Sequence, residues 1–392
     1  MKEKSQFAIE NGTIYTPLKI IEDGVLLVRD GKIVELGTKS QVKIPEGFNK
    51  VDAQGLIICP GFLDLQVNGG GGVFLTENST YDDVCVMARA HAKFGTTGML
   101  PTILTSEKNN ICKALKAVSE AVFKGTGGAT ILGSHLEGPF INEKKKGAHE
   151  VKFIRPPSID DFELFYQASE GTMKILTLAP EIEGSLSLIK YAKDRGVFLS
   201  IGHSVATYVQ VCNAVEAGLS LATHIFNAME GLGSREPGTV GAILANDKIK
   251  TGLIADCIHV HPMSMKIVIK SKGIKNVFLV TDAMPPIGTD LESFKLYDKT
   301  IYVKGGGCYA ADGTLAGSAL TMNIAVKNIH QQVGIPLNYA IAMATKVPAK
   351  AIGLSDRKGS LAVGKDADIV ICDRGMRIFK VFAEGRMVYE AK

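Results

Sequence analysis

Four polar residues follow apolar runs in a way that could build a metal centre. They are Glu137 in ILGSHLEGPF, His203 in SIGHS, His224 in ATHIFNAM and Asp282 in VTDA. Two neutral imidazoles and one carboxylate suit a catalytic zinc ion that keeps one position open for water. Such an ion acidifies the water and polarises a bound carbonyl, and Asp282 would then act as the general base that returns the proton to a leaving amine. Either histidine could instead hydrogen-bond a loop.

The elements that must position these residues read as eight strands separated by helices. The strand-like runs are Gly61–Asn68, Gly98–Leu104, Ala129–Leu136, Lys174–Ala179, Val197–Ile201, Leu219–Thr223, Lys250–Ala255 and Val277–Thr281, and the helical stretches are Lys108–Phe123, Ser185–Arg195, Val205–Ala217 and Pro262–Lys272. This alternation predicts an α/β fold with a (β/α)8 barrel. All four polar residues then fall at the carboxyl ends of strands, the face of such a barrel that carries active sites.

Both ends of the chain have β character. Residues 25–28 and 32–36 flank Asp30-Gly31, a strong hairpin signal, and we expect further strands at 360–363, 368–372 and 378–389. We therefore predict three segments: 1–58 and 355–392 as two parts of one small β-sandwich domain, and 59–354 as the catalytic barrel.

Three local patterns carry weaker expectations. Thr80 and Asp83 predict a capped helix start, and His91 on the inner face of that helix is expected to be a core residue. The four glycines at 69–72 predict a flexible loop. His135 has no chemical partner in the sequence and is expected to be structural.

Composition excludes several classes of protein. The chain of 392 residues is 46% hydrophobic and 21% charged, with a net charge of +4 and both signs interspersed, so no nucleic-acid surface is expected. Its seven cysteines are scattered, odd in number and without a C-x-x-C pair, which is typical of reduced thiols. The N-terminus, MKEKSQFAIENG, has no apolar core of signal-peptide length, and no apolar run of the chain reaches membrane-spanning length. We therefore expect a soluble cytoplasmic protein with no membrane partner.

Several motifs resemble the amidohydrolase superfamily and, within it, the N-acetylglucosamine-6-phosphate deacetylases, over essentially the whole chain. The superfamily is marked by PGFLD at 60–64 and GSLAVGKDADIV at 359–370. The deacetylases are marked by HLEGPF at 135–140 and THIFNAM at 223–229, with GHS at 202–204 and TDA at 281–283 also matching.

The resemblance implies an activity and a set of site residues. The activity is metal-dependent hydrolysis of the N-acetyl group of N-acetyl-D-glucosamine 6-phosphate, giving D-glucosamine 6-phosphate and acetate. Metal ligation falls to Glu137, His203 and His224, acid–base catalysis to Asp282, and polarisation of the acetamide carbonyl to His149. Substrate contacts are implied for Ala148, His149, Asn227, Ala228, Arg235, His259, Leu315, Ala316 and Gly317. The resemblance also implies a homodimer, or a tetramer built from it, in which Arg235 reaches the neighbouring site.

One departure from the superfamily pattern bears on the metal count. Many members carry His-x-His at the end of the first barrel strand, whereas this chain has Gln66-Val67-Asn68. Amides are weak ligands beside imidazole, so we predict one divalent metal per subunit, zinc first, with Fe²⁺, Mn²⁺ and Co²⁺ as the alternatives. The missing histidines, and Pro180-Glu181 in place of a lysine after strand four, disfavour a dihydroorotase or hydantoinase. A related amidohydrolase acting on another N-acyl compound, a deaminase and a non-catalytic sugar-phosphate-binding protein remain the alternatives.

Overall fold

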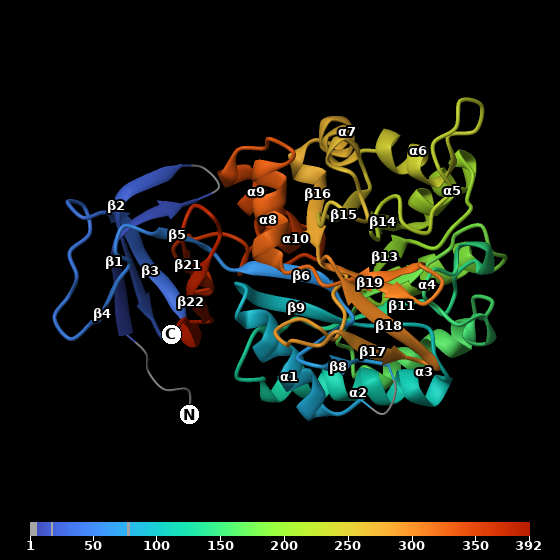
Figure 1. The fold of residues 1–392 in the computed structure, drawn as a ribbon, viewed down its shortest axis with the longest axis horizontal. Coiled ribbons are helices and arrows are strands. Elements are labelled where there is room, and N and C mark those ends of the chain that lie inside the picture. Colours follow the sequence, from blue (N-terminus) through green and yellow to red (C-terminus); the bar gives the residue numbers. More distant parts are fainter. Residues whose placement is uncertain (1–5, 17–18, 77–78) are drawn as a thin grey trace.

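The computed structural model describes all residues except 1–5, 17–18 and 77–78, and it divides into a large barrel and a smaller β unit (Figure 1). The barrel consists of eight parallel strands in chain order: β6 (Phe62–Val67), β9 (Thr96–Ile103), β11 (Ser134–Glu137), β12 (Met173–Leu178), β13 (Phe198–Ile201), β14 (Leu219–Ala222), β15 (Lys250–Ile254) and β16 (Val277–Val280). The backbone N–H of Asp282, just after β16, donates to the carbonyl oxygen of Gln66 at 3.0 Å and closes the ring. These are the eight strands that the sequence predicted, and the (β/α)8 fold is confirmed.

Helices surround this barrel and connect most of its strands. They are α1 (Tyr81–Ala92), α2 (Lys108–Lys124), α3 (Ile159–Ala168), α4 (Ser185–Asp194), α5 (Tyr208–Ala217), α6 (Gly238–Ala245), α7 (Pro262–Lys272), α8 (Met322–Gln331), α9 (Leu337–Ala344) and α10 (Lys346–Ala351), with short 3₁₀ turns η1 (Glu143–Lys145), η2 (Val151–Phe153) and η3 (Ile274–Asn276). Thr80 caps α1 in a full capping box with Asp83, as predicted. His91 of α1 is buried and its Nε2 lies 2.9 Å from the carbonyl oxygen of Gly69, so it is a satisfied core residue. Among the described residues, no helix is long and apolar enough to cross a membrane.

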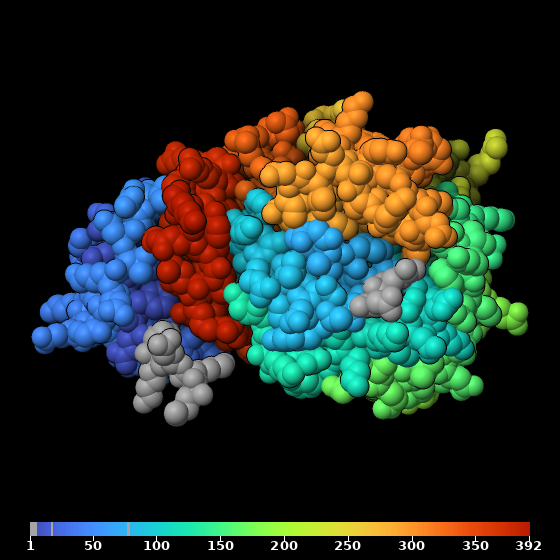
Figure 2. All heavy atoms as spheres, turned by 60° about the horizontal axis from the view of Figure 1, so that its bottom comes forward, coloured from blue at the N-terminus to red at the C-terminus, as the bar shows by residue number. Residues whose placement is uncertain are grey.

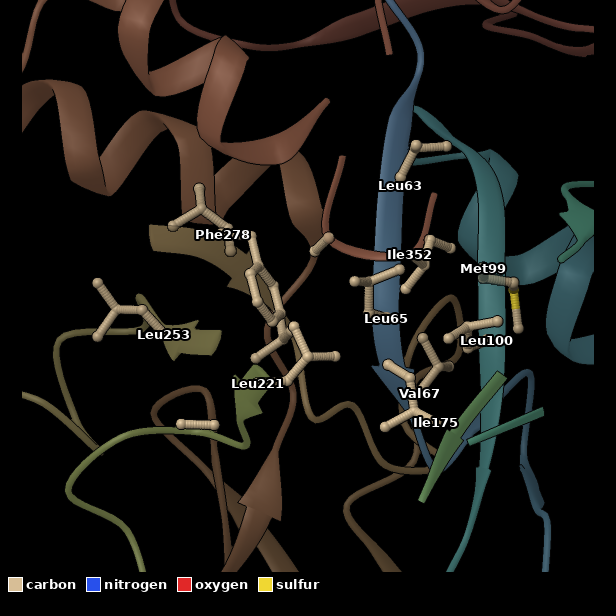
Figure 3. Packing of buried hydrophobic residues seen from close by; sticks show 14 of the residues in the cluster. Leu63, Leu65, Val67, Met99, Leu100, Ile175, Leu221, Leu253, Phe278 and Ile352 are labelled. Atoms are coloured by element: carbon tan, nitrogen blue, oxygen red, sulfur yellow. The ribbon is translucent and has the colours of Figure 1, made fainter. Parts of the chain in front are cut away.

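Apolar side chains from most of the barrel strands meet inside the ring. Figure 3 shows Leu65, Ile175, Leu221 and Phe278, which come from β6, β12, β14 and β16 and line one small internal cavity. Burying a side chain of this size contributes about 1.5–3 kcal/mol. The ring is therefore a packed core that holds the strand ends in fixed positions.

The small unit is a curled sheet built from both ends of the chain. Its strands are β1 (Gln6–Tyr15), β2 (Ile20–Arg29), β3 (Lys32–Thr38), β4 (Asn49–Asp52), β5 (Ile57–Pro60), β21 (Ile369–Cys372), β22 (Ile378–Ala383) and β23 (Arg386–Glu390). The predicted hairpin joins β2 and β3, and Asp30 and Gly31 both have the positive φ of a primed turn. The rings of Phe7 in β1 and Phe382 in β22 stack 4.9 Å apart although two strands separate them in the sheet, so the sheet curls around its own core.

The C-terminal strands lie between the N-terminal strands and the barrel (Figure 2). Strand β5 pairs with β1 at Ile57 and Ile58 and with β21 as far as Pro60, so the small sheet extends slightly past residue 58. We propose the predicted three-part division with Gly61 as the junction to the barrel.

Other local predictions were wrong because tertiary contacts decided them. Residues 360–363 form a connection without strand pairing, in which Ser360 and Leu361 are buried and Val363 is exposed. Residues 378–389 form two strands that turn at Glu384-Gly385. The four glycines are an ordered hairpin, β7 (Gly69–Gly70) and β8 (Val73–Phe74), instead of a flexible loop. An additional sheet, β17 (Ser293–Leu296), β18 (Lys299–Lys304), β19 (Gly307–Ala310) and β20 (Leu315–Ser318), was not predicted and follows β16. A further short strand, β10 (Thr130–Ile131), pairs with β9.

Candidate active site

The barrel brings the four predicted residues together at its carboxyl-terminal face. Glu137 ends β11, and His203, His224 and Asp282 each follow their strand by two residues. The first three are 1–4% exposed, and Asp282 is half-buried. His203, His224 and Asp282 have φ values of 50°, 29° and 51°. This left-handed conformation is uncommon for residues other than glycine and clusters at functional sites, where it redirects the chain as the strand ends.

Glu137 lies between the two histidines. Its Oε1 is 3.0 Å from Nε2 of His203 and 2.9 Å from Nε2 of His224. Burial alone would raise the pKa of Glu137, but the contacts of its carboxylate with both imidazoles outweigh it and hold the pKa well below its ordinary value. Burial would likewise lower the pKa of His224, yet Glu137 raises it overall. The cluster is a strongly polar centre inside an apolar barrel.

This donor set fits a divalent metal. His203 Nδ1–H donates to the carbonyl oxygen of Lys145 at 2.8 Å, which fixes the tautomer and leaves Nε2 available as a ligand. Potential ligand atoms of Glu137, His149 and His203 lie within 4.8 Å of one another, so His149 also borders the centre. His224 Nδ1 is buried and has no hydrogen-bond partner among the described residues. A buried Glu/His/His cluster of this kind indicates a divalent metal site.

Two amides hold the carboxylate of Asp282. Gln66 Nε2 donates to its Oδ1 at 3.1 Å and Asn68 Nδ2 donates to the same oxygen at 2.6 Å. Gln66 Nε2 also donates to Oε2 of Glu137 at 3.0 Å. Burial, helped by the charge of Glu137, raises the pKa of Asp282. The sequence identified these amides only as poor metal ligands. The spacing of two residues between Gln66, on β6, and Asn68, just after it, was the available signal that both face the site.

His149 enters from the long connection between β11 and α3. The backbone N–H of Thr105 donates to its Nδ1 at 3.3 Å, and the Thr105 hydroxyl lies 2.8 Å from the same atom. Since a backbone N–H can only donate, Nδ1 is an acceptor and the ring proton is on Nε2. Burial and the neighbouring His203 lower the pKa of His149 well below its ordinary value, so the ring is neutral. Thr105 was not predicted, because nothing in the sequence brings it near residue 149.

Glu137, His149, His203, His224 and Asp282 line a cavity of about 160 Å³. The predicted substrate residues Ala148, Asn227, Ala228, His259, Leu315, Ala316 and Gly317 line it too, joined by Asn68, Leu104, Gly147 and Met284, which were not predicted to contact substrate. Nδ1 of His259 lies 2.5 Å from Oδ2 of Asp256, a partner that orients its ring. Arg235 is exposed in the loop before α6 and is not among the described residues that line the cavity.

A second buried carboxylate, Asp64, ties β6 to β16 beneath the site. It accepts hydrogen bonds from the backbone N–H groups of Gln66 at 3.3 Å and Thr281 at 3.2 Å, and from the Thr281 hydroxyl. Burial raises the pKa of Asp64 to about 7, although the bonds from Thr281 oppose the shift. Asp64 is therefore largely protonated below neutral pH in the folded protein.

This shift predicts a pH dependence of stability. Between about pH 4 and about pH 7 the folded state keeps a proton that the unfolded state has lost, so the contribution of Asp64 falls by roughly 1.4 kcal/mol per pH unit as pH rises. Asp64→Asn does not titrate and should flatten the decline of melting temperature over this window, whereas Asp290→Asn, an exposed control, should keep the wild-type slope. Parallel wild-type and Asp64→Asn curves would contradict the assignment.

Comparisons with known proteins identify the family of the chain. A sequence model of the Amidohydrolase family matches residues 57–388. An N-acetylglucosamine-6-phosphate deacetylase from Haemophilus influenzae is 36% identical, with 97% of this chain and 99% of the relative covered. An N-acetylgalactosamine-6-phosphate deacetylase from a Shewanella species is 35% identical, with 100% and 99% covered.

A solved structure gives the same picture of the fold. A mutant of N-acetyl-D-glucosamine-6-phosphate deacetylase from Mycobacterium smegmatis, in complex with N-acetyl-D-glucosamine 6-phosphate, superposes with a TM-score of 0.91. It is 28% identical, and the match covers 98% of this chain and 99% of that one. The small unit and the barrel are therefore both part of the shared architecture.

Proposed function

The chain belongs to the amidohydrolase family, and we propose that it hydrolyses N-acetyl-D-glucosamine 6-phosphate to D-glucosamine 6-phosphate and acetate, a step in the breakdown and recycling of amino sugars. The observation that carries the proposal is one cavity that Glu137, His203 and His224 line together with Asp282 and His149. One of the two relatives is named for N-acetylglucosamine 6-phosphate and the other for its epimer, N-acetylgalactosamine 6-phosphate. The assay described below therefore includes both sugars.

Glu137, His203 and His224 would hold one divalent metal ion, with zinc first and Fe²⁺, Mn²⁺ or Co²⁺ as alternatives. When bound, the ion supplies Lewis acidity for the acetamide carbonyl and lowers the pKa of a water molecule toward neutrality. The lone pair that His203 presents on Nε2, with Nδ1–H bonded to Lys145, supports this assignment.

Asp282 carries the proton. Both amide donors bind its Oδ1, and among the described residues no hydrogen bond reaches Oδ2. Oδ2 therefore takes the proton of the attacking water and delivers it to the nitrogen of the departing amine. Because the pKa of Asp282 is raised, the free-energy cost of protonating its carboxylate during the reaction is lower.

His149 supports the charge that develops on the acetyl oxygen. Its Nδ1 is bonded to Thr105, so its Nε2–H is the donor that remains for the substrate. A neutral donor in a water-poor site stabilises an oxyanion without prior proton transfer. Loss of this donor should reduce turnover more than it reduces substrate binding.

The sugar phosphate would contact Asn227, Ala228 and His259 on one wall and the β20 segment Leu315–Gly317 on another. Arg235 would come from a second copy of the chain in a homodimer, or in a tetramer built from it. Its exposed position outside its own cavity supports this role, because arginine binds phosphate bidentately wherever it can reach it.

The phosphate contact predicts a selective effect. Unphosphorylated N-acetylglucosamine should have a kcat/KM about 10²-fold lower than the 6-phosphate, the size expected for losing one or two charge-assisted hydrogen bonds. Arg235→Ala should penalise only the phosphorylated substrate, and it should be rescued by mixing with an Asp282→Asn chain if Arg235 acts across the dimer. Equal kcat/KM for N-acetylglucosamine and its 6-phosphate would contradict the proposed phosphate contact.

The proposed ligand set predicts how many metal ions each subunit holds. Metal analysis of the purified chain should find about one tightly held divalent ion per subunit, because Gln66 and Asn68 donate to carboxylates and leave no second ligand set among the described residues. A chelator should abolish acetate release and added Zn²⁺ should restore it. Two tightly held ions per chain would contradict the single site.

One assay tests the function as a whole. Acetate release from N-acetylglucosamine 6-phosphate is measured with and without chelator, beside N-acetylgalactosamine 6-phosphate and a panel of other N-acyl and amino substrates. Turnover confined to another substrate would favour a different amidohydrolase, and binding without turnover would favour a non-catalytic protein. We also propose a cytoplasmic location, which cell fractionation can test.

A further inference from the structure

A chain of polar side chains crosses the barrel interior directly beneath the proposed metal ligands. We call it the hydroxyl chain: His135, Thr177, Ser200 and Thr223, from β11, β12, β13 and the end of β14. All four residues are buried. Barrel interiors are normally filled by branched apolar residues, such as Leu65 and Ile175 in Figure 3, and burying four polar groups costs free energy unless each is bonded.

Hydrogen bonds join the members of the hydroxyl chain in the order His135, Thr177, Thr223 and Ser200. His135 Nδ1 lies 3.0 Å from the carbonyl oxygen of Leu65, and His135 Nε2 lies 2.7 Å from Oγ1 of Thr177. Thr177 Oγ1 lies 2.7 Å from Oγ1 of Thr223, which lies 2.6 Å from Oγ of Ser200. The chain thus connects four neighbouring strands through side chains alone.

The carbonyl at one end fixes the direction of all these bonds. Because the carbonyl of Leu65 can only accept, His135 carries its proton on Nδ1 and its Nε2 accepts from Thr177. The Thr177 oxygen must then accept from Thr223, and the Thr223 oxygen from Ser200. Each hydroxyl has one proton and it is already committed, so cutting one link leaves buried partners unpaired.

The hydroxyl chain lies within a few residues of each ligand. His135 is two residues before Glu137, Thr223 is immediately before His224, and Ser200 is three residues before His203. Thr177 is the register partner of both Glu137 on β11 and Ser200 on β13. A change in the hydroxyl chain therefore acts directly on the ends of β11, β13 and β14, from which the ligands extend.

We propose that the hydroxyl chain is a positioning device that sets the relative placement of Glu137, His203 and His224 and so determines how tightly the metal is held. The inference rests on the proposed ligand set. Residues that orient ligands from behind typically change metal affinity by about 10- to 100-fold when they are lost, although they never touch the ion. His135, expected from the sequence to be structural only, would act through its neighbours.

The test cuts the hydroxyl chain at its centre. Thr223→Val keeps the shape of the side chain and removes the hydroxyl that bonds both Thr177 and Ser200. Thr251→Val is the matched control, because Thr251 is a fully buried threonine on β15 whose hydroxyl donates to the carbonyl oxygen of Gly252 at 3.2 Å, outside the hydroxyl chain. Thr223→Ser keeps the hydroxyl and tests rescue. Zn²⁺ affinity and the Zn²⁺ dissociation rate are measured by competition with a chromophoric chelator, beside the melting temperature.

We expect Thr223→Val to weaken Zn²⁺ binding by about 10- to 100-fold, Thr251→Val to change it less than about twofold, and Thr223→Ser to restore it. Equal Zn²⁺ affinity in all variants, or equal losses in both valine variants, would overturn the inference while leaving the proposed function intact. If Thr223→Val does not fold, Ser200→Ala removes only the terminal link, and unchanged Zn²⁺ binding there would overturn the inference too. A wild-type chain that binds no divalent metal would overturn the proposed function together with it.

Discussion

Asp282→Asn should lower the rate of acetate release by about 10²- to 10⁴-fold, the usual contribution of a positioned general acid–base. Asparagine has nearly the same shape and its oxygen can still accept from Gln66 and Asn68, so the site should keep its geometry. What is lost is the one oxygen that can take a proton from water and pass it to the amine. Turnover is measured with saturating N-acetylglucosamine 6-phosphate.

Two measurements separate this loss of chemistry from a loss of structure. The variant should bind the substrate and hold its metal as the wild type does, because Asp282 is not one of the proposed ligands. Asp312→Asn, an exposed aspartate in the turn between β19 and β20, should retain wild-type turnover. Turnover of Asp282→Asn within tenfold of the wild type would exclude Asp282 as the general base.

Glu137→Gln should remove both metal binding and activity, with at least a 100-fold loss of metal affinity as a rough lower bound, since even residues behind the ligands change affinity by about 10- to 100-fold. Among the described residues, Glu137 is the only carboxylate that both His203 and His224 contact, and a neutral amide cannot replace its charge. The glutamine would also face the amide of Gln66, which already donates to Oε2. Glutamine has one acceptor oxygen in place of two, so an oxygen that accepts from Gln66 leaves only the NH2 group to face the histidines and the metal.

Metal content and Zn²⁺ affinity are the direct measurements, and Glu143→Gln is the matched control, an exposed glutamate on the same connection after β11. The control should keep one metal per chain and full turnover. Glu137→Gln that retains metal with wild-type affinity would transfer the ligand role to another group. His149 would then be the first candidate, because it lies with Glu137 and His203 in one cluster.

Much of the fold is encoded locally. Asp30-Gly31 fixes the β2–β3 hairpin because both residues adopt a positive φ, and Thr80 with Asp83 fixes the start of α1. The alternation of apolar runs and helices placed Glu137, His203, His224 and Asp282 at strand ends. A closed parallel barrel permits one common rim for those ends, so the candidate centre could be predicted without coordinates.

Contacts between distant segments could not be predicted in this way. The role of His149 came from resemblance alone, and its bond to Thr105 depends on how a long connection folds back over the rim. The sheet β17–β20 lies outside the strand–helix alternation of the barrel and was not predicted, yet it supplies Leu315–Gly317 to the cavity.

The sequence by itself determined the residue types available for chemistry, the strand that carries each, and the pairing of both chain ends in one β unit. Only the tertiary structure decided which atoms meet: Gln66 and Asn68 on one oxygen of Asp282, Glu137 between two imidazoles, and the hydroxyl chain beneath them. The reason is physical. Strand periodicity fixes the face on which a side chain lies, whereas hydrogen-bond distances inside a barrel depend on ring closure and on the left-handed turns that follow three of its strands.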